Sequence, residues 1–238
     1  MAASNFVSLF LGLETLSISL YVLIAYRRSR DHSIEAGVKY LILASVSSAF
    51  LLFGMGLIYV NTGSLEINTG SLEFNRIIPP LSNVVYSEPL LLTGFGMMMV
   101  GIGFKLALVP FHMWTPDVYQ GAPVPVTTYI ATVSKGAVMA LLLRFFFSIR
   151  GFQNPGFILI ITIIAILSMF VGNLLALKQQ NVKRILAYSS IANMGYLLVT
   201  LLIGNETGIH AAIFYIVSYI ITSLGAFGVI TQIGRAHV

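Results

Sequence analysis

Long apolar runs separated by short polar or basic segments dominate the hydrophobic pattern of this chain. A membrane-spanning helix needs about 20 consecutive apolar residues. The stretches of sufficient length are 4–26, 37–60, 89–111, 122–147, 156–177, 184–203 and 208–230. Barrel strands are much shorter, and backbone polar groups in lipid must be paired within the chain, so these runs predict helices. We expect an all-α, polytopic membrane protein with about seven transmembrane helices.

Composition also favours a membrane protein. Hydrophobic residues make up 57% of the 238 residues and charged residues only 9%, whereas soluble domains carry about 25% charged residues. The chain has no cysteine, which excludes disulfides, thiolate chemistry and Cys-ligated iron–sulfur clusters. Its net charge is +5, but the basic residues form short clusters between apolar runs, which is the usual topology signal. We therefore expect a lipid bilayer and no nucleic acid as partner.

The distribution of Lys and Arg predicts the orientation in the membrane. If the first helix ends in the cytoplasm, the inner loops hold seven basic residues and the outer loops three. The inner set is Arg27, Arg28, Arg30, Lys39, Lys178, Lys183 and Arg184, and the outer set is Arg76, Arg144 and Arg150. This excess predicts that the first helix begins outside and that the last predicted helix ends inside.

Three ionisable side chains lie inside these apolar stretches: Glu14, Lys105 and Lys135. A charge at the centre of a transmembrane helix costs about 2.5–3.5 kcal/mol on insertion scales, and such residues are by default candidates for a proton or ion pathway. A Glu–Lys contact that forms and breaks changes the proton affinity of the lysine. We therefore expect proton-transfer roles for all three side chains.

Lys135 lies near the middle of the apolar stretch 124–147. Thr128 and Thr132 precede it at helical spacing and form a polar stripe that could hold water. The alternative is a lysine that snorkels to the interface, but roughly 11 residues of apolar helix on either side put the interface out of reach. We therefore expect Lys135 to be buried in the protein interior.

Four prolines within residues 110–125 interrupt the region that follows Lys105. Each proline removes a backbone donor and clashes with the preceding turn, so we predict that the helix breaks at or just after Pro110. Broken helices free backbone groups that bind water or ions. The alternative is a proline-rich connection whose aromatic residues, Trp114 and Tyr119, lie in the headgroup belt.

The other polar candidates carry less information. His112 flanks the predicted break and could relay protons, although a hydrogen-bonding role at the interface fits equally well. Asp117 is expected to cap or position the adjoining loop. The glycines of Gly94–Gly103 follow no predicted strand and precede no Gly-Lys-Ser/Thr, so we interpret them as packing glycines rather than a nucleotide loop. We predict no metal site.

Two segments do not fit the membrane pattern. The loop between the second and third runs contains a tandem duplication, Asn61–Ile67 followed by Asn68–Phe74, which we interpret as a tolerated insertion in an exposed loop. The last six residues, Ile233–Val238, match no membrane logic, and we predict that they are a non-native tail. The membrane domain is thus expected to comprise residues 1–232.

A resemblance to a known family emerges from the motif at the predicted break. The run Gly103–Pro123, GFKLALVPFHMWTPDVYQGAP, resembles the antiporter-like membrane subunits of respiratory complex I, the NADH-quinone oxidoreductase. Its PDVYQGAP segment is similar to the N-type subunits, whereas M-type subunits typically have PDAH there. Further matches are Ser8–Glu14, Gly172–Leu177 and Lys183–Ile191, and the similarity extends over about residues 6–232.

The resemblance implies a role for each charged residue. Glu14 would be the acidic partner on the fifth helix of the full subunit, Lys105 the lysine of the discontinuous seventh helix, and Lys135 the central lysine of the eighth. In the family, quinone reduction elsewhere in the complex drives protons through such residues and internal water. No cofactor is expected on this chain, and NADH, flavin, iron–sulfur clusters and quinone are expected in other subunits.

The resemblance also implies partners and a location. These are the neighbouring antiporter-like and small membrane subunits of the complex, in the bacterial inner membrane. The full subunit contains two inverted repeats, so the chain is expected to be a fragment. The alternatives are a subunit of a cation/proton antiporter or membrane-bound hydrogenase without NADH-quinone coupling, and a structural scaffold with incidental charges.

Overall fold

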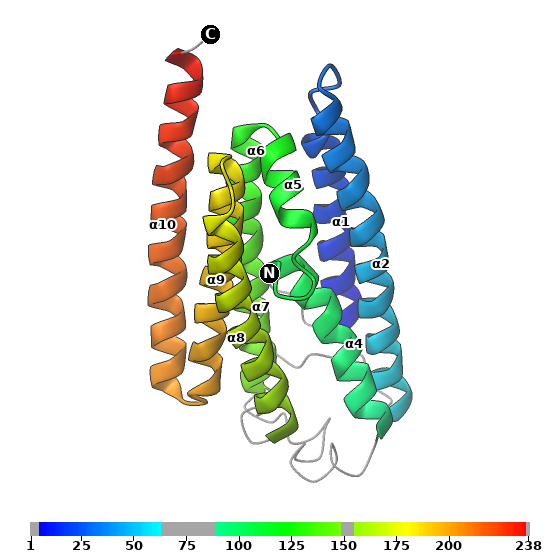
Figure 1. Cartoon of the computed structure of the whole chain (residues 1–238). Coiled ribbons are helices and arrows are strands. Elements are labelled where there is room, and N and C mark those ends of the chain that lie inside the picture. Colours follow the sequence, from blue (N-terminus) through cyan, green and yellow to red (C-terminus); the bar gives the residue numbers. More distant parts are fainter. Residues whose placement is uncertain (1–4, 63–88, 149–154, 237–238) are drawn as a thin grey trace.

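The computed structural model describes residues 5–62, 89–148 and 155–236, and the elements of these ranges are helical (Figure 1). The helices are α1 (Phe6–Ile24), α2 (Asp31–Thr62), α4 (Pro89–Leu106), α5 (Trp114–Gly121), α6 (Val124–Tyr129), the π-helical segment η2 (Ile130–Ser134), α7 (Lys135–Ser148), α8 (Pro155–Leu177), α9 (Val182–Leu202) and α10 (Glu206–Ala236).

Within the described residues, six helical segments are long and apolar enough to cross a membrane, with α6, η2 and α7 counted as one. A shorter apolar helix, Leu92–Leu106, corresponds to the interrupted third run. The prediction of an all-α polytopic fold with about seven helices and a discontinuous helix near Pro110 is confirmed.

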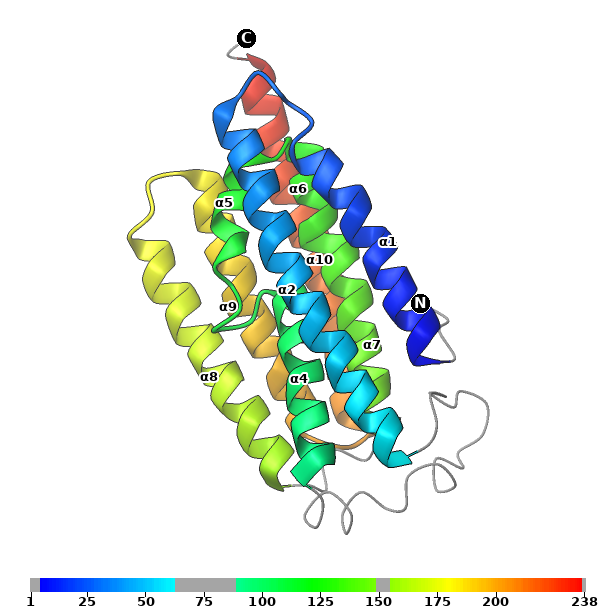
Figure 2. The same ribbon diagram turned by 90° about the vertical axis from the view of Figure 1, so that its right-hand side faces the viewer.

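The long helices run up and down in a bundle, with α10 at one edge (Figures 1 and 2). The α1–α2 and α8–α9 connections lie at the same end of the bundle. The basic clusters predicted to share one side of the membrane, from Arg27 to Arg30 and from Lys178 to Arg184, therefore do lie at one end. That this end faces the cytoplasm remains a prediction from charge.

The break in the third run lies closer to Lys105 than predicted. Helix α4 ends at Leu106, four residues before Pro110. The amide of Leu108 donates to the carbonyl of Gly103 at 2.8 Å and that of Ala107 to Phe104 at 3.0 Å, the paired bonds of a Schellman motif. Ala107 has φ 61°, the left-handed conformation that such an ending requires. A backbone cap, in addition to Pro110, therefore terminates the helix.

Glycines allow the closest helix contacts. A Cβ at Gly54 of α2 would lie 2.5 Å from the carbonyl oxygen of Gly94 of α4. A Cβ at Gly195 of α9 would lie 2.9 Å from the carbonyl of Ala165 of α8. Gly94 thus serves the packing role predicted for its cluster, whereas a Cβ at Gly96 would meet no atom of another segment within 4 Å. These contacts hold α4 on α2 and α9 on α8.

Aromatic side chains fill the core around the break. The rings of Tyr40 and Trp114 lie 5.0 Å apart, and those of Phe104 and Trp114 lie 5.4 Å apart. Trp114 is 2% exposed and Tyr119 is 0% exposed, so the alternative of a headgroup belt at these residues is wrong. The indole of Trp114 donates to the carbonyl of Phe104 at 3.0 Å and so ties α5 to the end of α4.

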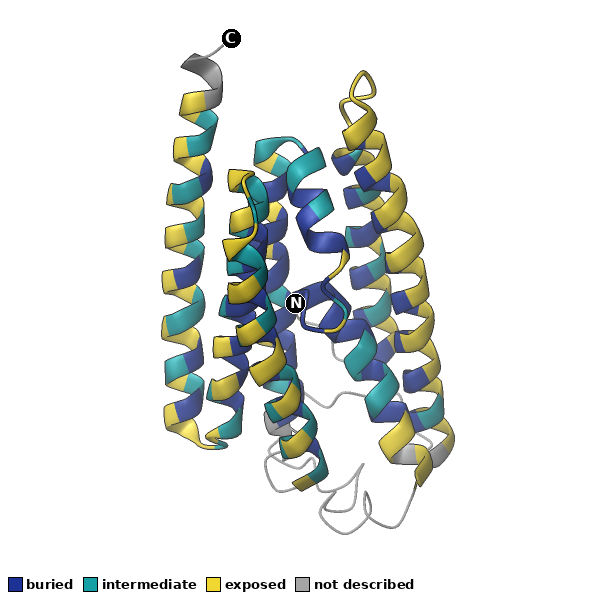
Figure 3. Cartoon of the chain, viewed as in Figure 1, coloured by how far each residue is buried: buried dark blue, intermediate teal, exposed yellow. Residues whose placement is uncertain are grey.

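Exposed residues line the outer faces of α2 and α10 (Figure 3), and large side chains are common among the exposed residues of the bundle. Most are apolar, which suits a surface that faces lipid. Most of the duplicated segment 61–74, with Arg76 and Arg150, lies outside the described residues. Helix α10 continues to Ala236, into the segment predicted to be a non-native tail, and its origin remains a prediction that the nucleotide sequence tests.

Candidate functional site

Lys105 is the penultimate residue of α4 and is only 4% exposed. Its ammonium donates a hydrogen bond to the hydroxyl of Ser17 on α1. The Ser17 hydroxyl donates its own proton to the carbonyl of Leu13 at 2.7 Å, so it is free to accept from the lysine. The charge of Lys105 is thus held in the interior by a neutral oxygen rather than by a directly bonded carboxylate.

Glu14 lies one turn before Ser17 on the same helix, where its carboxylate accepts a hydrogen bond from the hydroxyl of Ser48 on α2. None of the four ion pairs among the described residues joins Glu14 to Lys105. Glu14 and the Ser17 hydroxyl that binds Lys105 therefore lie on adjacent turns of α1. The predicted Glu14–Lys105 pair does not make a direct contact in this structure. Direct contact would require the two side chains to move.

Lys135 is the first residue of α7 and is 0% exposed. The expectation that it does not snorkel to the interface is confirmed. It directly follows the π-helical turn η2, and such insertions into α-helices often occur at functional sites. Its ammonium donates to the hydroxyl of Ser190 on α9 at 2.7 Å.

Three protic side chains meet around the Lys135 ammonium. The hydroxyls of Ser190 and Tyr219 lie 2.6 Å apart, and the hydroxyl of Tyr119 lies 3.3 Å from that of Ser190. The ammonium also lies 5.7 Å from the centroid of the Tyr119 ring. Among the described residues, the ammonium thus bonds the Ser190 hydroxyl, which in turn bonds the two tyrosine hydroxyls.

The threonines predicted to form a polar stripe beside Lys135 bond to the backbone of their own helix. Thr128 donates to the carbonyl of Val124 at 2.8 Å, and Thr132 donates to that of Thr128 at 2.7 Å. Both hydroxyls therefore donate to backbone carbonyls of their own helix, as threonine often does. The polar partner of Lys135 comes instead from α9.

A cavity of about 400 Å³ lies beside this cluster, between α9 and α10. Tyr119, Ser190 and Tyr219 line it, together with the polar side chains of Ser189 and Thr222. Lys135 does not belong to the lining. The hydroxyls of the cluster therefore stand between the lysine and the cavity.

His112 lies in the connection between α4 and α5 and is 7% exposed. Its Nδ1 atom and the nearby hydroxyl of Thr115 are both buried without a hydrogen-bond partner among the described residues. Burial of the imidazole excludes the interfacial role that sequence left open. A relay role for His112 stays a prediction.

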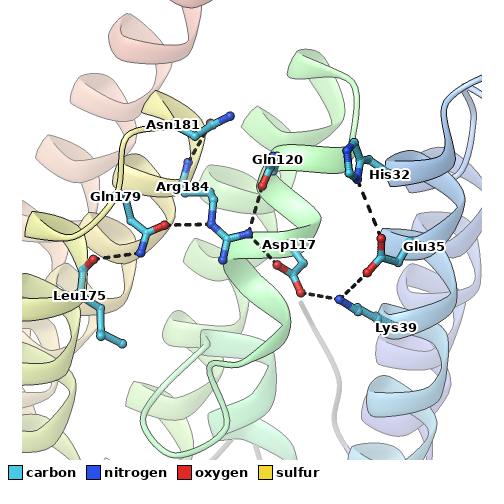
Figure 4. Close-up of polar contacts among 9 residues, drawn as sticks. All are labelled: His32, Glu35, Lys39, Asp117, Gln120, Leu175, Gln179, Asn181 and Arg184. Atoms are coloured by element: carbon cyan, nitrogen blue, oxygen red, sulfur yellow. Dashed lines mark hydrogen bonds and ion pairs between the residues drawn. The ribbon is translucent and has the colours of Figure 1, made fainter.

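Charged side chains hold α5 in place at the basic end of the bundle (Figure 4). The carboxylate of Asp117 pairs with Lys39 of α2 at 2.9 Å and with Arg184 of α9 at 2.7 Å. Lys39 also pairs with Glu35 at 2.7 Å. Burial raises the pKa of Asp117, but the bonds from Lys39 and Arg184 outweigh it and hold the pKa below the usual value. Asp117 thus has a positioning role, but it holds the helix α5 where a loop was expected.

Lys183 secures the C-terminal end of the same short helix. Its ammonium donates to the carbonyl of Ala122 at 2.8 Å and to that of Gln120 at 3.4 Å. A cation at this end satisfies carbonyls that the helix leaves unpaired and complements its dipole. Trp114 anchors the start of α5 and Lys183 anchors its end, so this helix is fixed between the sites of Lys105 and Lys135.

Several residues of the site were not predicted. They are Ser17, Ser48, Ser190 and Tyr219, whose hydroxyls bond the buried charges or one another. Single hydroxyls are common in transmembrane helices, so no local pattern marks them. Only the packing of α9 and α10 shows that Ser190 and Tyr219 meet Lys135. In the described ranges, no group of three His, Asp or Glu side chains gathers as metal ligands would.

Sequence comparison identifies similar proteins. The profile of the family described as NADH:quinone oxidoreductase/Mrp antiporter, TM, matches residues 3–238. The chain is 51% identical over 235 residues to NADH-quinone oxidoreductase subunit N of Nitrosospira multiformis, and the match covers 99% of this chain and 45% of that protein. The chain thus spans about half the length of this curated relative.

Structure comparison identifies the same fold in three respiratory or antiporter complexes. A chain of respiratory complex I from Thermus thermophilus matches with TM-score 0.80 and 38% identity, over 97% of this chain and 47% of that one. The archaeal membrane-bound sulfane sulfur reductase matches with TM-score 0.85 and 28% identity, over 98% and 46%. The Mrp complex from Dietzia sp. matches with TM-score 0.82, over 94% and 40%, but its 21% identity supports the fold alone.

Proposed function

Because the chain belongs to the NADH:quinone oxidoreductase/Mrp antiporter transmembrane family, we propose that it forms part of the proton-translocating membrane subunit of an NADH-quinone oxidoreductase. The subunit lies in the bacterial inner membrane beside other antiporter-like and small membrane subunits. It carries no redox group, and NADH, flavin, iron–sulfur clusters and quinone react elsewhere in the complex. Its own task is to move protons along buried Lys and Glu side chains.

The observation that carries this proposal is the chemistry around the two buried lysines. Structural lysines in a protein interior are normally paired with carboxylates, since an unpaired buried charge is costly. Lys105 and Lys135 are 4% and 0% exposed, yet each donates to a serine hydroxyl. A lysine held by hydroxyls can lose its proton without leaving an unpaired carboxylate behind. This is the property that a proton-transfer site needs.

Glu14 supplies the charge that changes the proton affinity of Lys105. Its carboxylate is held by Ser48 while the Lys105 ammonium is held by Ser17. If the two side chains approach, the ammonium form of Lys105 is stabilised, and if they separate, the proton is released toward Lys135. His112, buried at the break, is the candidate to pass protons to this region from the connection between α4 and α5.

A second candidate function is proton or cation transport without NADH-quinone coupling, in an antiporter or another respiratory membrane complex. One observation favours it, since the match to the sulfane sulfur reductase has the higher TM-score, 0.85 against 0.80. Both functions would use the same lysines. The 51% identity to an N-type subunit favours the first, and genes for hydrogenase or antiporter subunits beside this gene would favour the second.

The test is alanine substitution of each lysine in the full-length subunit within the intact complex. We expect Lys105→Ala and Lys135→Ala each to lower NADH-driven proton uptake by inverted membrane vesicles by about tenfold or more, since a positioned proton-transfer group contributes about 10²–10⁴. The rate of NADH oxidation coupled to quinone reduction should fall with it.

Two controls make the result specific. Lys178→Ala removes an exposed lysine from the α8–α9 connection and should leave proton uptake unchanged. The amount of assembled complex, measured on native gels, separates loss of transfer from loss of assembly. Normal proton uptake in both buried-lysine variants would instead favour a structural scaffold with incidental charges.

A further inference from the structure

The hydroxyl of Ser190 has three hydrogen-bonding partners, whereas its role as an acceptor for Lys135 requires only one. It accepts from the Lys135 ammonium at 2.7 Å, and it lies 3.3 Å from the Tyr119 hydroxyl and 2.6 Å from that of Tyr219. Ser190 is 3% exposed and Tyr219 is 8% exposed. Ser190 thus forms the centre of a small, buried, fully protic cluster that joins α7, α5, α9 and α10.

Donor and acceptor counts fix the direction of these bonds. A serine hydroxyl has one proton and two acceptor lone pairs. The ammonium can only donate, and the Tyr119 hydroxyl donates as well, so both lone pairs of Ser190 are used. Its single proton must then point to the Tyr219 oxygen. The bonds run in one direction, from Lys135 through Ser190 to Tyr219.

The hydroxyl-bearing residues Tyr119, Ser190 and Tyr219 all line one cavity, but the protons of Tyr119 and Ser190 are used within the cluster, so the Tyr219 proton is the one left for water. The cavity of about 400 Å³ between α9 and α10 is lined by Tyr219 and by further polar side chains, among them Ser189, Thr222 and Ser223. Since one water occupies about 30 Å³ of liquid, the cavity has room for roughly ten. Its polar lining offers the two to four hydrogen bonds that an ordered water needs.

We propose that Ser190 and Tyr219 are relay residues that carry the proton of Lys135 into water in this cavity, a step that deepens the proposed function and rests on it. The Lys135 ammonium gives a proton to Ser190 Oγ while the Ser190 proton passes to the Tyr219 oxygen. The Tyr219 phenol proton passes to a water molecule. Lys135 is left neutral, the water becomes hydronium, and both hydroxyls are restored with their bonds reversed.

A purely structural role for the cluster makes a different prediction. If the hydroxyls only solvate the ammonium, removal of either tyrosine hydroxyl leaves the bond from Lys135 to Ser190 in place, because each tyrosine hydroxyl bonds Ser190 and neither bonds Lys135. If the cluster is a relay, Tyr219 lies on the route and Tyr119 is a side branch. The two tyrosines therefore form an internal pair, and Phe keeps the ring of each while removing the hydroxyl.

The experiment measures NADH-driven proton uptake by inverted vesicles that contain the intact complex with the full-length subunit. We expect Tyr219→Phe and Ser190→Ala each to lower the rate about tenfold, which is below the roughly 10²–10⁴ that a positioned proton-transfer group contributes. Tyr119→Phe should cause a clearly smaller loss. Ser190→Thr, which keeps the hydroxyl, should restore most of the rate. Tyr196→Phe, which removes an exposed phenol of α9 that accepts from Asn173 of α8, should match the wild type.

Each outcome either supports the relay or overturns it. Equal rates for Tyr219→Phe and Tyr119→Phe, whether both normal or both impaired, overturn it. Failure of Ser190→Ala to assemble leaves the decision to the two tyrosine variants, which retain the packing. Lys135→Ala, measured in parallel, separates the two levels: normal uptake there contradicts the proposed function itself. Lost uptake in Lys135→Ala with normal uptake in Tyr219→Phe contradicts the relay alone.

Discussion

Lys105 and Lys135 are both buried lysines beside an irregularity in a helix, but their surroundings differ. Lys105 is the penultimate residue of α4, and the acidic side chain of Glu14 lies one turn from Ser17, whose hydroxyl accepts from Lys105. Lys135 begins a helix after a π-helical turn, and its polar partners among the described residues are hydroxyls that border a cavity. In the proposed function, a nearby carboxylate can therefore control the proton affinity of Lys105, whereas the hydroxyls around Lys135 are suited to pass a proton on.

The difference follows from how each group stabilises an ammonium. A carboxylate acts over several ångströms in a medium of low dielectric, so a modest change in its distance alters the proton affinity of a lysine. A hydroxyl acts only at hydrogen-bond distance, but it can accept a proton on one lone pair while it donates another. In the proposed function, Glu14 and Lys105 therefore set when a proton is released, and Lys135 with its hydroxyls sets where it goes.

Of the variants that test this difference between the two lysine sites, Glu14→Gln is expected to have the largest effect. The amide keeps a hydrogen-bonding group for Ser48 but removes the charge that distinguishes the Lys105 site. We expect NADH-driven proton uptake by the intact complex to fall severalfold because Lys105 then lacks its charge partner. Glu35→Gln, which removes an acid at the end of the bundle, is the control. Uptake as high in Glu14→Gln as in that control would show that the Lys105 site works by hydroxyls alone, like the Lys135 site.

Much of the fold could be predicted from sequence because hydrophobic length is decisive in lipid. The runs 156–177 and 184–203 match α8 and α9 within two residues at each end. The break was placed too late because the prolines were the visible signal. The backbone bonds that end α4 at Leu106 involve Gly103, Phe104 and Ala107, and alanine at the left-handed position gives no sequence signal.

The second prediction concerns the end of α4, next to Lys105 and away from Lys135. Ala107→Val places a β-branched residue at φ 61°, where an L-residue already costs about 1–2 kcal/mol. We expect a further loss of about 1 kcal/mol or more, since branching crowds this conformation most. The measurement is the thermal midpoint of the purified subunit in detergent. Ala107→Gly tolerates the conformation and should not lower the midpoint. Equal midpoints for Val and Gly would show that the Schellman ending does not hold the end of α4.

The candidate site was only partly visible in the sequence, and the reason is physical. Glu14, Lys105 and Lys135 stand out because charge is rare in apolar helices. Ser190 and Tyr219 do not, since they come from helices that meet only through tertiary packing. An ionised side chain in lipid needs a partner from elsewhere in the protein, so it stands out in the sequence. A hydroxyl can be satisfied by its own helix, as those of Thr128 and Thr132 are.

The smallest expected effect concerns α5, the helix that separates the two sites. Asp117 ties it to Lys39 and Arg184, and these pairs are partly exposed, so Asp117→Asn should cost about 1 kcal/mol or less. The folded pKa of Asp117 lies below its usual value. Its contribution is therefore fully present above the unfolded pKa of about 3.9 and is lost as pH falls through the folded value.

The thermal midpoints of the wild type and Asp117→Asn should thus differ by the same small amount at pH 7.5 and pH 5, and the difference should shrink only at lower pH. His32 contacts Glu35 rather than Asp117 (Figure 4), and His32→Gln measured in parallel excludes it as the source of any change between those values. A difference that already narrows between pH 7.5 and 5 would contradict a lowered pKa for Asp117. Since α5 carries Trp114 against α4 and Tyr119 against Ser190, a small shift of this helix would then reach both lysines together.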